Sequence, residues 1–448
     1  MKKIILLIIL VLGTFSCTKE FENHNQTTAD AVYQTAEAYP GIIMGVTKEF
    51  ATGALYRIIH ASGMTTKEFG NMLTYETEIQ LSEGGPALTG ANYSLSSMWS
   101  SLHRERGVAE KILENIDNVD FHNSDKAAGY KAYALFMKAI TTGYMSAYWE
   151  KVTLGNDYDN NAQFSDRLDG YRQAVADLNA AKTLLDNNSN AASEINNLVS
   201  FEFSFADVIN AFIARYEIEL GNYQEAYDAA DAVDLTARSV WSYDGGSIKN
   251  PIYANVIDAS TNLHIKPVDS LGLVGNQIPE LGDMRNDFYL DYIALRGTSC
   301  NIAVDNPEGF WATDATPIPV YLPGEMLLIK AEAKARMGGA SLADAVTLIN
   351  QVRTKTNDVF NVNAGLAAWT GNATDQTEVL DEIYKNYAIE LFMQGQRLPI
   401  HRRFYPDYLN SVDWSTANPC DLERKNNFYP YPDKERANNP NCPADPAF

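Results

Sequence analysis

Aromatic side chains concentrate in three segments of the chain that are rich in Gly, Asn, Ser, Thr and Pro, namely residues 60–97, 236–320 and 357–374. This composition predicts long irregular loops, and such loops in a compact domain are usually functional. An aromatic ring can cover the apolar C–H face of a sugar, while Asn, Asp and Arg side chains hydrogen-bond to its hydroxyl groups. Both kinds of side chain alternate in these loops, so the chemistry they could perform is ligand binding. The aromatic residues are Tyr75, Tyr93, Trp241, Tyr243, Tyr253, Phe288, Tyr289, Tyr292, Trp311 and Trp369.

The same rings have a second interpretation, in which they attach the loops to the rest of the protein as part of its core. For any single ring this packing role is a serious alternative. We expect two or three of the set to be exposed and available to a ligand.

Motifs for catalytic or metal chemistry are not recognisable. None of the six histidines belongs to an H-E-x-x-H motif, and the sequence contains neither G-x-S-x-G nor a phosphate-binding glycine loop. Asp157, Asp159 and Asn161 alternate as in a calcium loop, but the sixth-position glycine and the twelfth-position acid are missing. We therefore predict no catalytic residue, no bound metal and no cofactor. Because 57 acidic residues could form a glycosidase-like pair by chance, hydrolysis stays an alternative.

Helices are the elements that must position these loops. Between Pro317 and Phe404, apolar residues recur at intervals of three and four and predict three amphipathic helices. Pro323 suits the first turn of the first helix, and Gly338 and Gly339 end it. We expect Ser341 to cap the second helix and Asp375, with Glu378 three residues later, to cap the third.

Further helices are predicted upstream. Residues 205–233 resemble a tetratricopeptide unit, in which Gly221 joins two helices. Residues 127–152 and 171–185 have the spacing of a second helical pair, and residues 99–119 form another long helix that Ser96 or Ser97 could cap. We expect four helical pairs in all, in which the last helix of the C-terminal segment pairs with the part of the chain after it.

The C-terminal third resembles the SusD/RagB family of Bacteroidetes surface lipoproteins. The family's E-x-x-L-x-x-A-E-A, A-x-x-x-I-N-x-V-R and E-L-x-x-E-G-x-R-x-x-D-x-x-R patterns match, although Gln394 and Ile400 replace two acids of the last one. The closing P-x-P-x-x-E-x-x-x-N-P also matches. The residues that carry the resemblance are Glu325, Leu328, Ala331, Glu332, Ala333, Ala345, Ile349, Asn350, Val352, Arg353, Glu390, Leu391, Gly395, Arg397, Arg403, Pro430, Pro432, Glu435, Asn439 and Pro440.

The resemblance implies a mostly α fold. In it, tetratricopeptide-like helical pairs form a right-handed superhelix that carries long irregular ligand-binding loops, here in a single domain of residues 17–448. It implies a nutrient-binding protein, not an enzyme, that covers a SusC-like TonB-dependent transporter. The ligand would be an oligosaccharide or, as in some members, a peptide. The aromatic residues that we predict to bind the ligand are Trp311, Tyr289, Tyr292, Trp241 and Tyr93.

Residues 1–16 are predicted to be a signal peptide, because Lys2 and Lys3 precede an apolar run too short to span a membrane. Ser16 precedes Cys17, as in lipoproteins, so we predict that Cys17 is lipidated and anchors the protein to the outer membrane, facing the cell exterior. An ordinary secretory signal is the alternative. The net charge of −22 argues against a nucleic-acid partner and against direct contact with an anionic membrane surface.

Three expectations concern packing. Glu332 lies on an alanine-rich helix face, so it should be buried and paired with a cation such as Arg353 or Arg397. Arg285, in the motif Asp283-Met284-Arg285, should anchor a loop by an ion pair. Cys420 and Cys442 bracket the C-terminal tail and could form a disulfide, with three free thiols, Cys300 included, as the alternative.

Two other interpretations of the whole chain stay open. One is a helical-repeat scaffold that binds only protein partners, and the other is a surface glycoside hydrolase. Ligand binding without turnover would separate the family-based hypothesis from the hydrolase.

Overall fold

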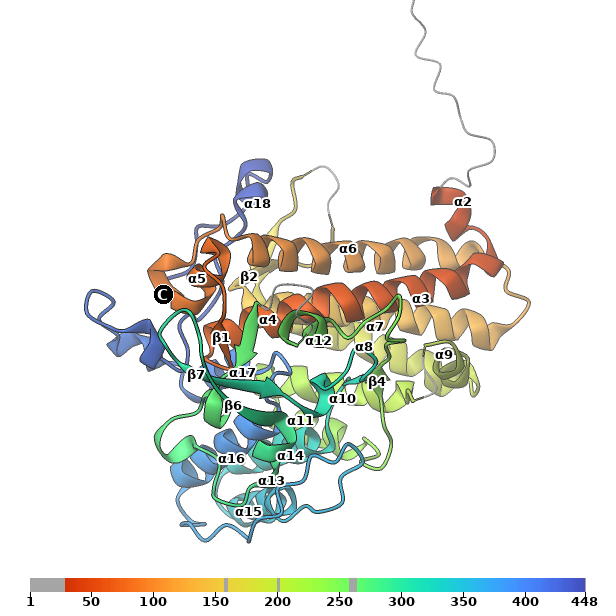
Figure 1. The fold of residues 1–448 in the computed structure, drawn as a ribbon. Coiled ribbons are helices and arrows are strands. Elements are labelled where there is room, and N and C mark those ends of the chain that lie inside the picture. Colours follow the sequence, from red (N-terminus) through yellow and green to blue (C-terminus); the bar gives the residue numbers. More distant parts are fainter. Residues whose placement is uncertain (1–28, 157–159, 200–201, 258–263, 448) are drawn as a thin grey trace, which may run out of the picture.

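The computed structural model describes residues 29–156, 160–199, 202–257 and 264–447. Most of these residues are helical (Figure 1). The α-helices are α2 (Ala29–Tyr33), α3 (Tyr39–Glu49), α4 (Leu55–Thr65), α5 (Glu76–Glu83), α6 (Tyr93–Asn115), α7 (Ser124–Tyr148), α8 (Arg167–Asn187), α9 (Ala191–Val199), α10 (Phe205–Leu220), α11 (Tyr223–Asp231), α12 (Pro251–Val256), α13 (Met284–Tyr289), α14 (Pro323–Met337), α15 (Ser341–Arg353), α16 (Gln376–Glu390), α17 (Arg397–Phe404) and α18 (Asp433–Asn438).

The strands are short and pair in antiparallel twos. β1 (Phe69–Asn71) pairs with β5 (Ile265–Pro267), β2 (Lys151–Thr153) with β3 (Phe164–Asp166), β4 (Val240–Trp241) with β8 (Ile318–Pro319), and β6 (Leu290–Arg296) with β7 (Ala303–Pro307).

Most of the residues predicted to begin, end or cap a helix do so in the structure. Pro323 begins α14, Gly338 ends it with φ 71°, and the Asp375 side chain accepts hydrogen bonds from the first backbone amides of α16. Two predicted caps are wrong. Ser341 is already the first residue of α15 and makes no capping bond. The long helix α6 begins at Tyr93 and is capped by Asn92, upstream of both predicted serines.

Successive helices pack side by side from α6 through α7, α8 and α10 to α11, α14, α15 and α16. In Figure 1 the long helices α3 and α6 cross the upper part of the molecule, and α14, α15 and α16 gather at its lower end. Gly221, with φ 77°, makes the turn of the α10–α11 pair. Gly143 allows α7 and α10 to approach closely, because an added Cβ there would overlap the Tyr216 ring. The predicted mostly α fold of paired helices is confirmed.

The predicted loop segments are only partly irregular. Residues 60–97 contain the end of α4, β1, α5 and the start of α6, and residues 236–320 contain the short strands β4 to β8 with α12 and α13. Residues 357–374, all of which the structure describes, have neither helix nor strand. Strands of two to seven residues leave too few alternating positions for a periodicity signal, which is why the sequence showed these segments only as loops.

Buried apolar residues from Tyr39 to Tyr431 form one connected cluster. The short strands and their connections pack back onto the helices and contribute to this cluster, which decides where the loop aromatics lie. Among the described residues, no helix is long and apolar enough to cross a membrane.

Candidate functional site

The predicted ligand-binding rings fall into two groups. Trp311 and Tyr289 are fully buried, and Trp241 is only 3 % exposed. Tyr289 donates a hydrogen bond to the Glu390 carbonyl oxygen at 2.6 Å, and its ring packs against that of Phe392 at 5.6 Å.

The expectation that Trp311, Tyr289 and Trp241 offer an open ring face is therefore wrong. Tyr289 lies in α13, which packs against α16, and Trp311 lies in a short helical turn that packs against α13 and β8. The Trp241 ring packs against Phe50, with the ring centroids 5.1 Å apart. Burying such a large apolar ring stabilises the fold. These three rings therefore belong to the core and are not available to a ligand.

Tyr292 and Tyr93 are exposed, at 77 % and 70 %. Tyr75, which the sequence placed among the loop aromatics without ranking it first, is 52 % exposed. Tyr292 lies on β6, Tyr93 is the first residue of α6, and Tyr75 immediately precedes α5. The Asn92 side chain donates hydrogen bonds to the Thr77 carbonyl oxygen and to Gln80, both at 3.0 Å, and so ties the start of α6 to α5.

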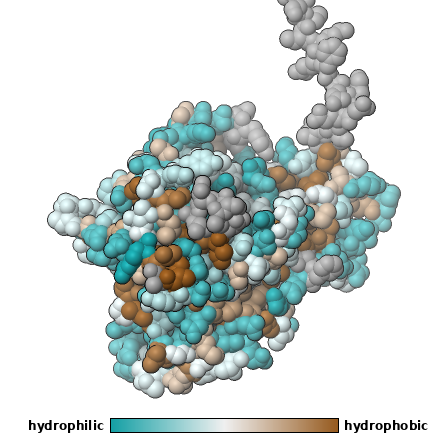
Figure 2. Space-filling model, in the orientation of Figure 1, coloured by the Kyte–Doolittle hydropathy of each residue, from teal (hydrophilic) through white to brown (hydrophobic). Residues whose placement is uncertain are grey.

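The strand pairs β1–β5 and β6–β7 bring Tyr75 and Tyr292 to one region of the molecule. A bridge between Val268 and Val304 joins the two pairs, and Gly70 of β1 faces β7 so closely that an added Cβ would lie 2.6 Å from a methyl group of Val304. In Figure 1 β1, β6 and β7 lie together, and Figure 2 shows apolar side chains gathered on the same face around them. We call this region, carried by Tyr75, Tyr292 and the four strands, the aromatic face.

Polar groups of the aromatic face are held in place by hydrogen bonds. The Asn71 side chain accepts from the Leu73 amide at 2.8 Å and donates to the Ser299 hydroxyl at 2.9 Å. Lys266 donates to the Asn306 side chain at 2.6 Å, and burial lowers the pKa of its ammonium group. These positions are therefore ordered before any ligand arrives, which reduces the entropic cost of binding.

His264 contacts Tyr75, and Glu78 in turn contacts His264. The His264 ring meets the Tyr75 ring edge-on at 6.1 Å, and its Nδ1 lies 3.7 Å from a Glu78 oxygen. His60 Nε2 contacts the other Glu78 oxygen at 2.8 Å. Burial alone would raise the pKa of Glu78, but the two histidines outweigh it and lower that pKa to about 2. The carboxylate therefore stays ionised and fixes His264 beside Tyr75. No sequence motif marked His60, Glu78 or His264, because long-range folding brings them together.

A disulfide between Cys300 and Cys420 attaches the β6–β7 hairpin to the C-terminal part of the chain. The predicted Cys420–Cys442 bridge is wrong, and Cys442 is a free, partly buried thiol. Burial, with Glu435 nearby, raises the pKa of the Cys442 thiol to about 11. Cys300 is 120 residues from Cys420, so only the folded backbone could reveal this pairing. The bridge restrains the hairpin that presents Tyr292.

Ion pairs secure the segment before the hairpin. Arg285 forms an ion pair with Asp283 at 2.7 Å and with Glu390 at 3.2 Å, and all three side chains are buried. The expected role of Arg285 as a loop anchor is confirmed.

Glu332 is also buried and paired, as expected, but with different partners. Arg336 and Arg403 contact it at 2.7 and 2.8 Å, whereas Arg353 instead pairs with Glu280 and Glu382.

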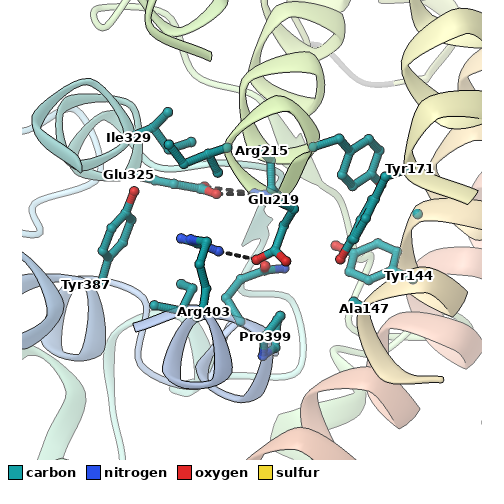
Figure 3. A pocket seen from close by; sticks show the side chains of 15 residues that line it. Tyr144, Ala147, Tyr171, Arg215, Glu219, Glu325, Ile329, Tyr387, Pro399 and Arg403 are labelled. Atoms are coloured by element: carbon teal, nitrogen blue, oxygen red, sulfur yellow. Dashed lines mark hydrogen bonds and ion pairs between the residues drawn. The ribbon is translucent and has the colours of Figure 1, made fainter. Parts of the chain in front are cut away.

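An enclosed cavity lies among charged side chains between α7, α10, α14 and α17 (Figure 3). Arg215 makes a paired hydrogen bond to Glu325 at 2.7 and 2.8 Å, and Arg403 reaches Glu219 across the cavity. Its volume of about 20 Å³ has room for roughly one water molecule. This cluster therefore holds the helices together and does not accommodate a nutrient.

No group of three or more His, Cys, Asp or Glu side chains in the described parts of the chain is arranged to hold a metal ion. Of the calcium-like triplet, Asp157 and Asp159 lie outside the described residues. Cys17, the predicted lipidation site, lies outside them too.

The fold is a helical scaffold that presents exposed aromatic rings beside ordered polar groups. Residues 312–443 match the model of the SusD family. The fold is similar to that of a SusD homolog from Bacteroides thetaiotaomicron, with a TM-score of 0.69 and 12 % identity over 94 % of this chain and 99 % of that one.

Two further structures show the same likeness. A SusD superfamily protein from Bacteroides vulgatus has a TM-score of 0.68 and 14 % identity, covering 92 % of this chain and 99 % of that one. A laminarin-binding SusD-like protein has a TM-score of 0.65 and 15 % identity, covering 92 % of this chain and 99 % of that one. No curated protein matches the sequence closely enough to indicate a relationship. The segment 312–443 is thus similar to the SusD family, and the fold of most of the chain is that of SusD-like structures.

Proposed function

We propose that this protein is a carbohydrate-binding lipoprotein of the outer membrane, which captures an oligosaccharide and passes it to a SusC-like TonB-dependent transporter. The observation that carries the binding role is the pair of exposed rings, Tyr75 and Tyr292, on a face whose polar groups are already ordered. Large apolar rings are unfavourable when they are exposed to water. A ligand with apolar C–H faces would cover them and remove this unfavourable exposure.

The family supports the sugar as ligand, because one structure with the same fold is a laminarin-binding protein. A peptide ligand is the alternative within the family. The transporter partner and the location at the cell surface rest on the family resemblance alone. We propose binding without turnover, so incubation with a bound glycan should release no shorter products.

Replacing Tyr292 or Tyr75 by alanine tests the binding role. We expect affinity for a glycan identified on an oligosaccharide array, with laminarin as the first probe, to fall at least several-fold, or by about 1 kcal/mol or more, because a stacking platform is lost. Isothermal titration calorimetry would measure this. Stability should change by no more than about 0.5 kcal/mol, because both rings are exposed.

Met44→Ala is a matched control, since Met44 is an exposed apolar residue on α3. It should leave glycan affinity unchanged. If both tyrosine variants bind as tightly as the wild type, the aromatic face is not the site. Failure to bind any glycan, together with saturable binding of a peptide, would favour the peptide alternative.

Replacing Cys17 by alanine tests the anchor. Without an acyl chain on the mature N-terminus, the protein should move from the membrane fraction to the soluble fraction. Cys442→Ala is the control, because Cys442 is a free thiol far along the chain and its loss should not change fractionation. Unchanged fractionation of the Cys17 variant, with no acyl mass on the wild-type N-terminus, would contradict lipidation.

A further inference from the structure

A second pocket opens beside the ion pairs at the start of α8 and the end of α17. Its volume is about 400 Å³, within the range of small-molecule sites. It is lined by Arg167, Glu219, Arg402, Arg403, Pro406, Asn427 and Phe428. Three guanidinium groups and a single carboxylate therefore surround one space, in a chain whose net charge is −22.

The neighbouring carboxylates do not balance this charge. Arg336, Glu332, Arg403, Glu219 and Arg167 form a continuous chain of ion pairs, part of which is visible in Figure 3. This chain holds three arginines and two glutamates, and so carries one uncompensated positive charge. Arg402, which stands outside the chain of ion pairs, adds a second.

Arg402 is the unsatisfied member of the group. It is 7 % exposed, donates one hydrogen bond to the Asn427 carbonyl oxygen at 2.7 Å, and lies over the Phe428 ring at 4.3 Å. Its Nη2 is buried without a hydrogen-bond partner, and no carboxylate of the described residues forms an ion pair with it. Burial, followed by the charge of Arg167, lowers the pKa of Arg402 to about 9. A buried cation without a counter-charge is costly, and an anion in the pocket would relieve that cost.

We infer that this pocket binds the oxyanion of a small acidic ligand, a carboxylate or a phosphate, through Arg402 with Arg167 beside it. Guanidinium groups match the geometry of both anions and bind them with paired, charge-assisted hydrogen bonds. The Asn427 side-chain oxygen is a second buried group without a partner, and it can accept a hydrogen bond from a hydroxyl group next to the anion. The ligand class is therefore a hydroxyl-bearing acid or its phosphate. This anion site is independent of the aromatic face.

Calorimetric titration of the full mature chain with inorganic phosphate and with glucuronate, at low ionic strength, tests the site. We expect saturable binding of at least one of these anions, weakened by added salt, and no binding of neutral glucose to the same pocket. Arg402→Gln should weaken anion binding at least tenfold, or by about 1.4 kcal/mol. Arg172→Gln, on the exposed side of α8, is the control and should bind as the wild type does.

A structural role for Arg402 predicts a different result. In that case Arg402→Gln would melt at a lower temperature without anion, and wild-type stability would not respond to anion. Our inference predicts that the unliganded variant melts no lower than the wild type and loses the anion-induced rise in melting temperature. If Arg402→Gln does not fold, Arg167→Gln, at the more exposed edge, serves in its place. Absence of saturable anion binding by the wild type, or binding that neither variant weakens, would overturn the inference. Glycan binding by the aromatic face should be unaffected, so failure here is distinguishable from failure of the proposed function.

Discussion

Replacing Trp311 by alanine should lower the free energy of unfolding by about 3–5 kcal/mol, because it removes a fully buried ring and leaves a cavity. The surroundings cannot easily close around it, since Phe310 and the adjoining aromatic cluster are themselves packed on the helices. Thermal and chemical denaturation would measure the loss. The sequence had instead predicted that Trp311 binds the ligand.

Comparing Trp311→Ala with Tyr292→Ala distinguishes a packing role from a ligand-binding role. Tyr292 lies in the same predicted loop segment but is 77 % exposed, so its removal should affect ligand affinity and not stability. If Trp311→Ala instead weakens glycan binding while the melting temperature stays constant, the ring must be accessible to ligand, and the packing described for it would be wrong.

Replacing Glu332 by alanine should cost about 3–5 kcal/mol, because it removes a fully buried carboxylate and leaves Arg336 without its counter-charge and Arg403 with Glu219 alone. The double variant Glu332→Ala with Arg336→Met should recover part of the loss, since it also removes the arginine whose carboxylate partner was Glu332. Glu83→Ala, at an exposed position, is the control. A loss under about 0.5 kcal/mol for Glu332→Ala would show that the ion pairs contribute nothing to stability.

The effect of Glu332→Ala should also depend on pH. Burial would raise the pKa of Glu332, but Arg403 and Arg336 outweigh it and hold that pKa below its ordinary value of 4.5. A carboxyl whose folded pKa is depressed stabilises the fold above its unfolded pKa, and loses that contribution as the pH falls through the folded pKa. The stability difference between wild type and variant should therefore be full at neutral pH and shrink as the solution is acidified below 4.5.

Gln394 and Ile400 are the two positions where the chain departs from the acids of the SusD/RagB pattern. Ile400 is a buried apolar residue two positions before Arg402. An acid at this position would lie one helical turn before Arg403, which in this chain pairs with Glu332 and Glu219. Carboxylates from distant helices therefore take the place of the local acid.

Local features of the sequence were sufficient for most of the helical scaffold. Pro323, Gly338, Asp375 and Gly221 act within a few residues of themselves, through backbone angles and hydrogen bonds that the local sequence specifies. Asn92 caps α6 in place of Ser96 or Ser97 because the chain has several suitable residues close together there, whereas α15 simply begins at Ser341 without a capping bond. The burial of Glu332 was also predictable, because it lies on the alanine-rich face of its helix, and such a face packs against other helices.

Tertiary structure alone decided which loop aromatics are open to a ligand. Tyr289 and Tyr292 are three residues apart in one segment, yet one is fully buried and the other is 77 % exposed. Tyr289 ends α13, which packs against α16, whereas Tyr292 lies on the strand β6 that follows. The burial of Tyr289 is set by contacts with residues about a hundred positions away, such as Glu390. The same holds for the partner of Cys420 and for the partners of Glu332, because proximity across the fold leaves no trace in local spacing. Sequence therefore determined the scaffold and the type of chemistry, and packing between distant segments determined which residues can perform it.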